Sequence, residues 1–149
     1  MRITKPALIV VCILLLTSCA QIEGALFGTK VMDMEKTGVD PAHFSFEMQE
    51  DQTEHSLVAK LTYSNRNVRS PRFDVTVTDP TGEITTKTLY NRPTGSTRKN
   101  QRRTSSSMKS IIQKKVMSFF PQNGTYQVRI EAKDQGVEMQ NSVLQVFVR

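Results

Sequence analysis

Residues 72–90 read RFDVTVTDPTGEITTKTLY, and this stretch predicts a β-hairpin. Phe73, Val75 and Val77 alternate with polar residues, which is the period of a strand with one buried face. The next four residues, DPTG at 79–82, favour a tight turn because aspartate bonds its own backbone, proline presets φ and glycine accepts positive φ. The run EITTKTLY then returns as the partner strand.

The same period of two recurs on both sides of this hairpin. It predicts strands in HFSFEMQ (43–49), SLVAKLTY (56–63) and TYQVRIEA (125–132), with their apolar and tyrosine side chains facing inward. The short polar link between the first two segments predicts that they pair with each other as an antiparallel hairpin. The last run, SVLQVFVR (142–149), is apolar on both faces, as expected of a central strand.

The segment MKSIIQKKVMSFF (108–120) has no single period. It fits a short helix near 108–118, or a short strand over 116–120. Taken together, six to eight short strands joined by turns predict an all-β fold, an antiparallel β-sandwich.

The N-terminus has the pattern of a lipoprotein signal peptide. Two cations precede the apolar run PALIVVCILLL (6–16), which is shorter than the roughly 20 residues of a transmembrane helix. The boundary LTSC (16–19) resembles a bacterial lipobox. We therefore expect residues 1–18 to be removed and Cys19 to carry the lipid that anchors the protein to a membrane; the alternative is an ordinary signal peptide with a chance cysteine.

Ala20 follows the expected lipidation site, in place of the aspartate that retains many lipoproteins in the inner membrane. By resemblance to those sorting rules, we expect an outer-membrane location, with the periplasmic face favoured over the cell surface. The expected organisation is a lipidated tether and lead-in over 19–40, then a sandwich domain over 41–149.

One basic insert, over 91–115, interrupts this domain. Between residues 92 and 115 there are eight cations and no acid, whereas the whole chain has a net charge of only +6. The candidates for contact with an envelope protein, anionic lipid or lipopolysaccharide are Arg98, Lys99, Arg102, Arg103, Lys114 and Lys115. The alternative is a solvated loop. Nucleic acid is not an expected partner, because no aromatic residue stands between these cations to stack on bases.

The residue types needed for catalysis are sparse. Cys12 leaves with the signal and Cys19 is modified, so no thiol remains as nucleophile or metal ligand. The two histidines, His43 at a strand start and His55 in a predicted loop, are expected to be solvated. There is no glycine-rich phosphate loop and no nucleophile elbow. We expect no cofactor, no metal site and no enzymatic activity.

The order of features is similar to the gliding-motility lipoprotein H family of Bacteroidetes. The resemblance rests on the lipobox, on FSFEM and LVAKLTYSNR, on the hairpin SPRFDVTVTDPTGEITTKTL, and on FFPQNGTYQVRI after a variable insert. It implies a non-enzymatic outer-membrane lipoprotein that serves as an accessory component of an envelope machine, for gliding motility or linked protein secretion. Two alternatives stay open: a lipoprotein of a contractile (type VI-like) secretion apparatus, and a lipoprotein that binds glycan or peptidoglycan.

Overall fold

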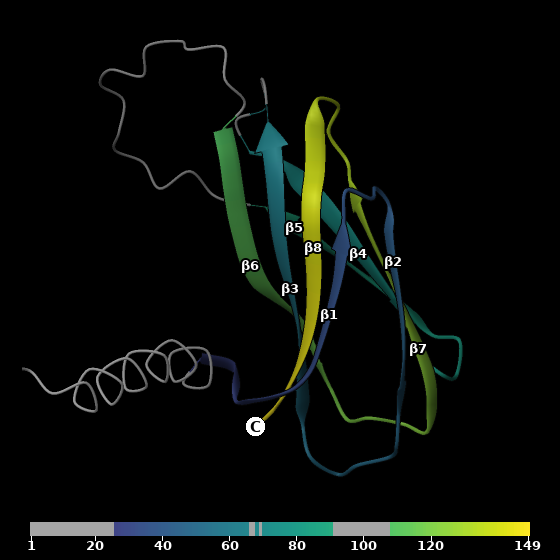
Figure 1. The fold of residues 1–149 in the computed structure, drawn as a ribbon. Coiled ribbons are helices and arrows are strands. Elements are labelled where there is room, and N and C mark those ends of the chain that lie inside the picture. Colours follow the sequence, from purple (N-terminus) through teal and green to yellow (C-terminus); the bar gives the residue numbers. More distant parts are fainter. Residues whose placement is uncertain (1–25, 66–67, 69, 91–107) are drawn as a thin grey trace, which may run out of the picture.

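A computed structural model describes residues 26–65, 68, 70–90 and 108–149. In these ranges the chain forms two antiparallel four-stranded sheets that pack face to face (Figure 1), which confirms the predicted β-sandwich. The strands are β1 (Thr29–Thr37), β2 (Ala42–Met48), β3 (His55–Asn65), β4 (Arg72–Thr78), β5 (Ile84–Tyr90), β6 (Met108–Phe119), β7 (Gly124–Ala132) and β8 (Val137–Val148).

Sheet A has the strand order β1-β8-β3-β6, and sheet B has the order β2-β7-β4-β5. The predicted hairpin is β4–β5, paired in register from Phe73 with Leu89 to Thr78 with Ile84. The prediction of a central last strand is also confirmed, because β8 pairs with β1 on one side and with β3 on the other.

The core lies between the sheets and is built from the residues of the predicted inward faces. Phe73 and Tyr63 face each other across it with ring centroids 4.8 Å apart, and Phe46 stacks on Tyr126 at 5.4 Å. Both tyrosines are buried, as the alternation predicts. Burial of each such ring stabilises the fold by about 2–3 kcal/mol, which is the main source of stability in a domain without disulfides.

The expected helix near 108–118 is wrong, because these residues form the edge strand β6. A bulge opposite Leu57 and Val58 explains the missing period. Ile112 faces the core before it, Val116 is the extra residue of the bulge, and Phe119 faces the core after it. The inward positions therefore change from even to odd numbers within one strand, so the apolar spacing mimics that of a helix.

The predicted pairing of residues 43–49 with 56–63 is also wrong. β2 lies in sheet B beside β7, and β3 lies in sheet A between β6 and β8. The link between them crosses from one sheet to the other. It is held there because Asn123 accepts a hydrogen bond from the Glu50 N–H (2.7 Å) and Pro121 accepts one from the Asp51 N–H (3.3 Å).

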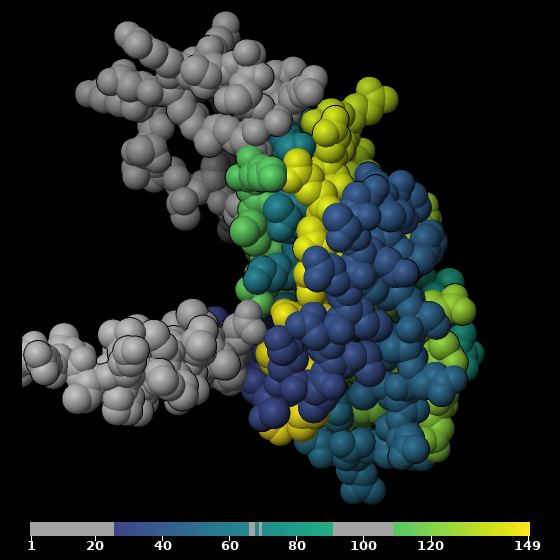
Figure 2. Space-filling view, in the orientation of Figure 1, coloured from purple at the N-terminus to yellow at the C-terminus, as the bar shows by residue number. Residues whose placement is uncertain are grey.

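The segment before β1 packs on the outer face of sheet A. The ring of Phe27 lies 5.4 Å from that of Phe147, which is fully buried although it is on the side of sheet A away from the core. Gly28 has a φ of +105°, and a Cβ at this position would lie 2.1 Å from the carbonyl oxygen of Val148. Figure 2 shows these first residues against the end of β8. Part of the predicted lead-in is therefore an ordered layer, and its second half is β1.

The sandwich has two ends with different chain segments. At the lead-in pole, β1 begins beside the end of β8, with Thr29 opposite Val148, and β3 begins at His55. At the distal pole, β5 ends at Tyr90 and β6 begins at Met108 (Figure 1). β3 runs from one pole to the other, a distance of about 33 Å at the usual rise of a strand. No helix in the described part of the chain is long and apolar enough to span a membrane.

Candidate functional site

A hollow of about 720 Å³ lies along β2, one of the two edge strands of sheet B. We call it the β2 hollow. It is lined by residues of four strands: Met34, Glu35, Lys36, His43, Phe44, Ser45, Thr76, Thr78, Gln127, Val128 and Arg129.

The register of sheet B places the polar part of this lining. His43 lies opposite Arg129, and Ser45 lies opposite Gln127; β4 continues the two rows with Thr76 and Thr78. Because side chains alternate across a strand, all six stand on the outer face while the residues between them fill the core. The alternation that builds the core therefore also builds a face of hydroxyl, amide, imidazole and guanidinium groups.

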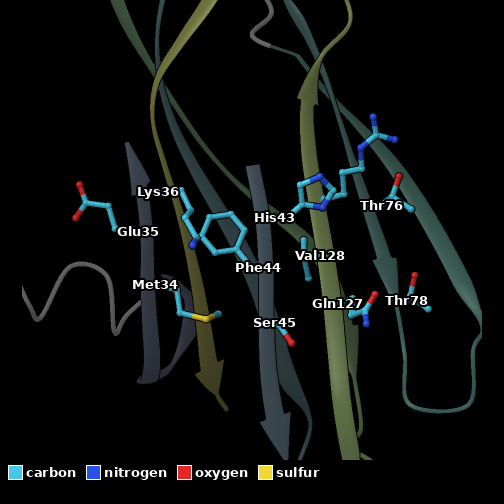
Figure 3. Close-up of a pocket in the computed structure, with 11 residues that line it drawn as sticks. Met34, Glu35, Lys36, His43, Phe44, Ser45, Thr76, Thr78, Gln127 and Val128 are labelled. Atoms are coloured by element: carbon cyan, nitrogen blue, oxygen red, sulfur yellow. The ribbon is translucent and has the colours of Figure 1, made fainter. Parts of the chain in front are cut away.

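The other part of the lining lies between the sheets and is mainly apolar, with one lysine at its margin. Figure 3 shows Met34 and Lys36 of β1 and Phe44 of β2 directed into the space between these two strands. Met34 is half-buried and packs against the core, and Phe44 is 4% exposed. β2 thus has an apolar slot on its inner side and a polar face on its outer side.

The charges around the hollow are partly neutralised within the fold. Arg129 pairs with Glu131 at 2.6 Å, and Glu35 accepts a hydrogen bond of 2.6 Å from the side-chain amide of Asn141. Among the described residues, the side chains of Lys36 and His43 have no such partner. The hollow therefore keeps one cation available on the slot side of β2.

Among the described strands, none pairs with the edge of β2 beside the slot, and we call this the free edge of β2. The Lys133 N–H donates to the Arg72 carbonyl (2.9 Å), so the odd-numbered residues of β7 pair with β4 and the even-numbered residues with β2. On β2, the residues paired with β7 are then the even-numbered ones. The N–H and C=O groups of His43, Ser45 and Glu47 point to the free edge.

The opposite side of the sandwich is closed by two lysines. Lys114 of β6 donates to the carbonyl of Tyr90 on β5 (2.8 Å), and its Nζ lies 5.3 Å from the centroid of that ring. Lys87 of β5 donates in the other direction, to the carbonyl of Lys115 (3.0 Å). We call this pair of contacts the lysine latch. It occupies one backbone carbonyl on the free edge of each strand, which hinders further strand pairing at these positions.

Most residues predicted as functional from the sequence fall outside the described ranges: Cys19, Arg98, Lys99, Arg102 and Arg103. The two that are described, Lys114 and Lys115, lie on β6. Lys114 is one of the two donors of the lysine latch, so a partner would compete with its contact to Tyr90.

Sequence reasoning missed the β2 hollow because it paired β2 with the wrong strand. The polar positions of HFSFEMQ and TYQVRIEA are visible as alternation in the sequence, but only their register shows that they form one surface.

One ion pair borders the polar face. Asp74 lies on the outer side of β4, 2.7 Å from the ammonium of Lys133, and accepts a 2.6 Å hydrogen bond from Thr88. Burial acts to raise the pKa of Asp74, but the bonds from Lys133 and Thr88 outweigh it and hold that pKa below its usual value. At the distal pole, hydrogen bonds from the side chain and the backbone N–H of Arg72 likewise lower the pKa of Asp134. These carboxylates are ionised structural partners.

The two histidines have different environments. His43 is exposed on the outer face of sheet B, as expected. The expectation of a solvated His55 is wrong: this residue starts β3, is 4% exposed, and packs 6.0 Å from the ring of Phe119. Its Nδ1 lies 2.8 Å from the carbonyl of Thr53. In the described ranges no three or more His, Cys, Asp or Glu side chains are grouped so as to hold a metal ion.

No protein-family model matches the sequence, and no curated protein matches it. Solved structures give distant matches. The CBM36-1 domain of a multidomain xylanase from the hindgut metagenome of Trinervitermes trinervoides is 12% identical at a TM-score of 0.38, with 78% of this chain and 88% of that chain covered. The infectious bursal disease virus Gt strain structure is 11% identical at a TM-score of 0.40, with 78% of this chain and 33% of that chain covered. At these identities and TM-scores, neither match assigns a function to this chain.

Proposed function

We propose that the protein is a non-enzymatic, lipid-anchored component of an envelope machine at the outer membrane, serving gliding motility or linked protein secretion. The observation that carries the proposal is the ordered lead-in at one pole of the sandwich. Phe27 and Gly28 are fixed on sheet A, so seven residues, 20–26, separate the expected lipid at Cys19 from the folded domain. Even fully extended, this link spans at most about 28 Å.

A short link supports a positioning role. The lead-in pole is then held close to the bilayer, and the distal pole is about 33 Å further along the strands. The basic insert follows Tyr90, the last residue of β5 at the distal pole, and its final residues, 108–115, form the first part of β6. Charge attraction in physiological salt is screened over about 8 Å, which favours a protein partner over the anchoring bilayer as the target of the insert.

The polar face of the β2 hollow is weaker support for a glycan-binding role. Glycan sites are often built on exposed aromatic side chains, and none of the residues lining the hollow is an exposed aromatic. The tyrosines Tyr63 and Tyr126 are buried in the core. The assembly role therefore takes precedence.

The test is cross-linking in cells of a tagged, lipidated protein, followed by mass spectrometry of what co-purifies. Repeated recovery of gliding or secretion components at near-stoichiometric yield supports the proposal, and recovery of a contractile apparatus identifies the rival machine. Recovery of lipid, lipopolysaccharide or glycan fragments alone overturns the assembly role. The Cys19→Ser variant is the control, because it removes the expected anchor and leaves the sandwich unchanged.

The insert has its own control in a variant with Arg98, Lys99, Arg102 and Arg103 replaced by glutamine. If this variant recovers the same partners at low salt, the insert is not part of the interface.

A further inference from the structure

We propose that the free edge of β2 binds an extended segment of a protein partner, which continues sheet B as a fifth strand and inserts an apolar side chain between Met34 and Phe44. This inference rests on the proposed assembly function and names the surface that performs it. It combines three observations: a free backbone edge, an apolar slot beside it, and an unpaired cation at the margin of the slot.

The backbone edge identifies the chemical class of the partner. His43, Ser45 and Glu47 each present one N–H and one C=O, so an added strand can form up to six hydrogen bonds along β2. Such a row of alternating donors and acceptors is matched by another extended main chain. On the other side of the sandwich the lysine latch occupies one edge carbonyl of β5 and one of β6, so fewer acceptors remain there for an added strand.

The slot determines which side chains of the incoming segment can bind. Successive residues of a strand point to opposite faces, so every second residue of the segment faces into the sandwich. There it meets the half-buried Met34 and the ring of Phe44, which together accept an apolar side chain. The intervening residues lie on the outer face beside Ser45 and the hydroxyl and amide groups of the hollow.

The charge at the slot makes the prediction more specific. Lys36 is exposed and has no ion-pair partner among the described residues, whereas the nearby Glu35 is held by Asn141. An acidic residue in the bound segment complements the Lys36 ammonium. The expected partner segment is therefore extended, carries apolar residues at every second position and has an acidic residue next to one of them.

The experiment pans a phage-displayed library of random 12-residue peptides against the full-length protein, purified in detergent after maturation in its host. We expect enriched peptides with the pattern described above. Their affinity should fall about tenfold or more for Ser45→Pro, because proline removes one edge donor and obstructs pairing at that position. Proline is tolerated here by the fold, since the Ser45 N–H points away from β7. The matched control is Thr86→Pro, which places proline at a free-edge position of β5 and should bind the peptides as the wild type does.

A second variant keeps the test valid if Ser45→Pro does not fold, as judged by circular dichroism. Panning against Lys36→Glu should replace the acidic residue of the enriched peptides with a basic one. The inference is overturned if no peptide family is enriched, if Ser45→Pro binds the peptides as tightly as the wild type, or if Lys36→Glu enriches the same acidic peptides. It is also overturned if sedimentation shows that the wild type dimerises and Ser45→Pro does not, because the occupant of the edge is then a second copy. None of these results changes what the cross-linking experiment recovers, so the two proposals fail separately.

Discussion

Replacement of Gly28 by alanine should release the lead-in from sheet A. The new Cβ would lie 2.1 Å from the Val148 carbonyl oxygen and 2.9 Å from its carbon, and Val148 is paired with Thr29 on one side and His55 on the other. The φ of +105° adds strain of about 1–3 kcal/mol for a residue with a side chain. Detachment of the segment that precedes β1 costs less free energy than this clash and strain.

Detachment limits the loss of stability. It exposes the half-buried Phe27 and uncovers Phe147, which corresponds to about 2–3 kcal/mol of the free energy of unfolding. Urea denaturation followed by circular dichroism measures this loss. Limited proteolysis with chymotrypsin measures the detachment, because cleavage after Phe27 should become fast in the variant and stay slow in the wild type.

Gly38→Ala is the control for this experiment. Gly38 also has a positive φ, of +64°, but a Cβ there would meet nothing within 4 Å. It should cost about 1 kcal/mol and leave the cleavage after Phe27 slow. The reasoning is refuted if Gly28→Ala unfolds at the same urea concentration as the wild type and Phe27 stays protected.

Three further predictions concern the core, the latch and the ion pair. Phe73→Ala, at a fully buried site, should lower the free energy of unfolding by about 3–5 kcal/mol in urea denaturation. Lys114→Met should cost no more than about 1 kcal/mol, and hydrogen exchange should become faster near Tyr90 while the rest of the sandwich is unchanged. Because the folded pKa of Asp74 is lowered, its contribution is complete above the ordinary value of 3.8 and is lost as the pH falls through the folded pKa. Asp74→Asn should therefore be less stable at neutral pH and lose less stability on acidification, measured by urea denaturation at several pH values between about 5 and 2.

Local patterns in the sequence were sufficient for the elements whose signals lie within a few residues. The β4–β5 hairpin follows from its turn, where Asp79 accepts hydrogen bonds from the N–H groups of Thr81 and Glu83. The inward faces of β2, β3 and β7 follow from their alternation. These features need no knowledge of the strand that lies next to them.

The alternation of apolar and polar residues did not predict the structure where a bulge shifts the inward positions, or where a strand pairs with one far away in the sequence. Bulges interrupt the ladders of β1, β6 and β8, and each one moves the inward positions from odd to even numbers or the reverse. This explains both the expected helix near 108–118 and the missed strand over 29–37. The β2 hollow was missed for a related reason, because its rows join residues that are more than eighty positions apart, such as His43 and Arg129.

The position of β8 in sheet A affects the order in which the strands can pair during folding. The last strand of the chain lies in the middle of sheet A, where it separates β1 from β3 and supplies Leu144, Val146 and Phe147 to two packed faces. Until those residues have been synthesised, β1 has no strand to pair with. Without β8, the only pair of neighbouring strands left in sheet A is β3 and β6. Folding of sheet A therefore depends on pairing between distant parts of the sequence, which is slower than the formation of local hairpins.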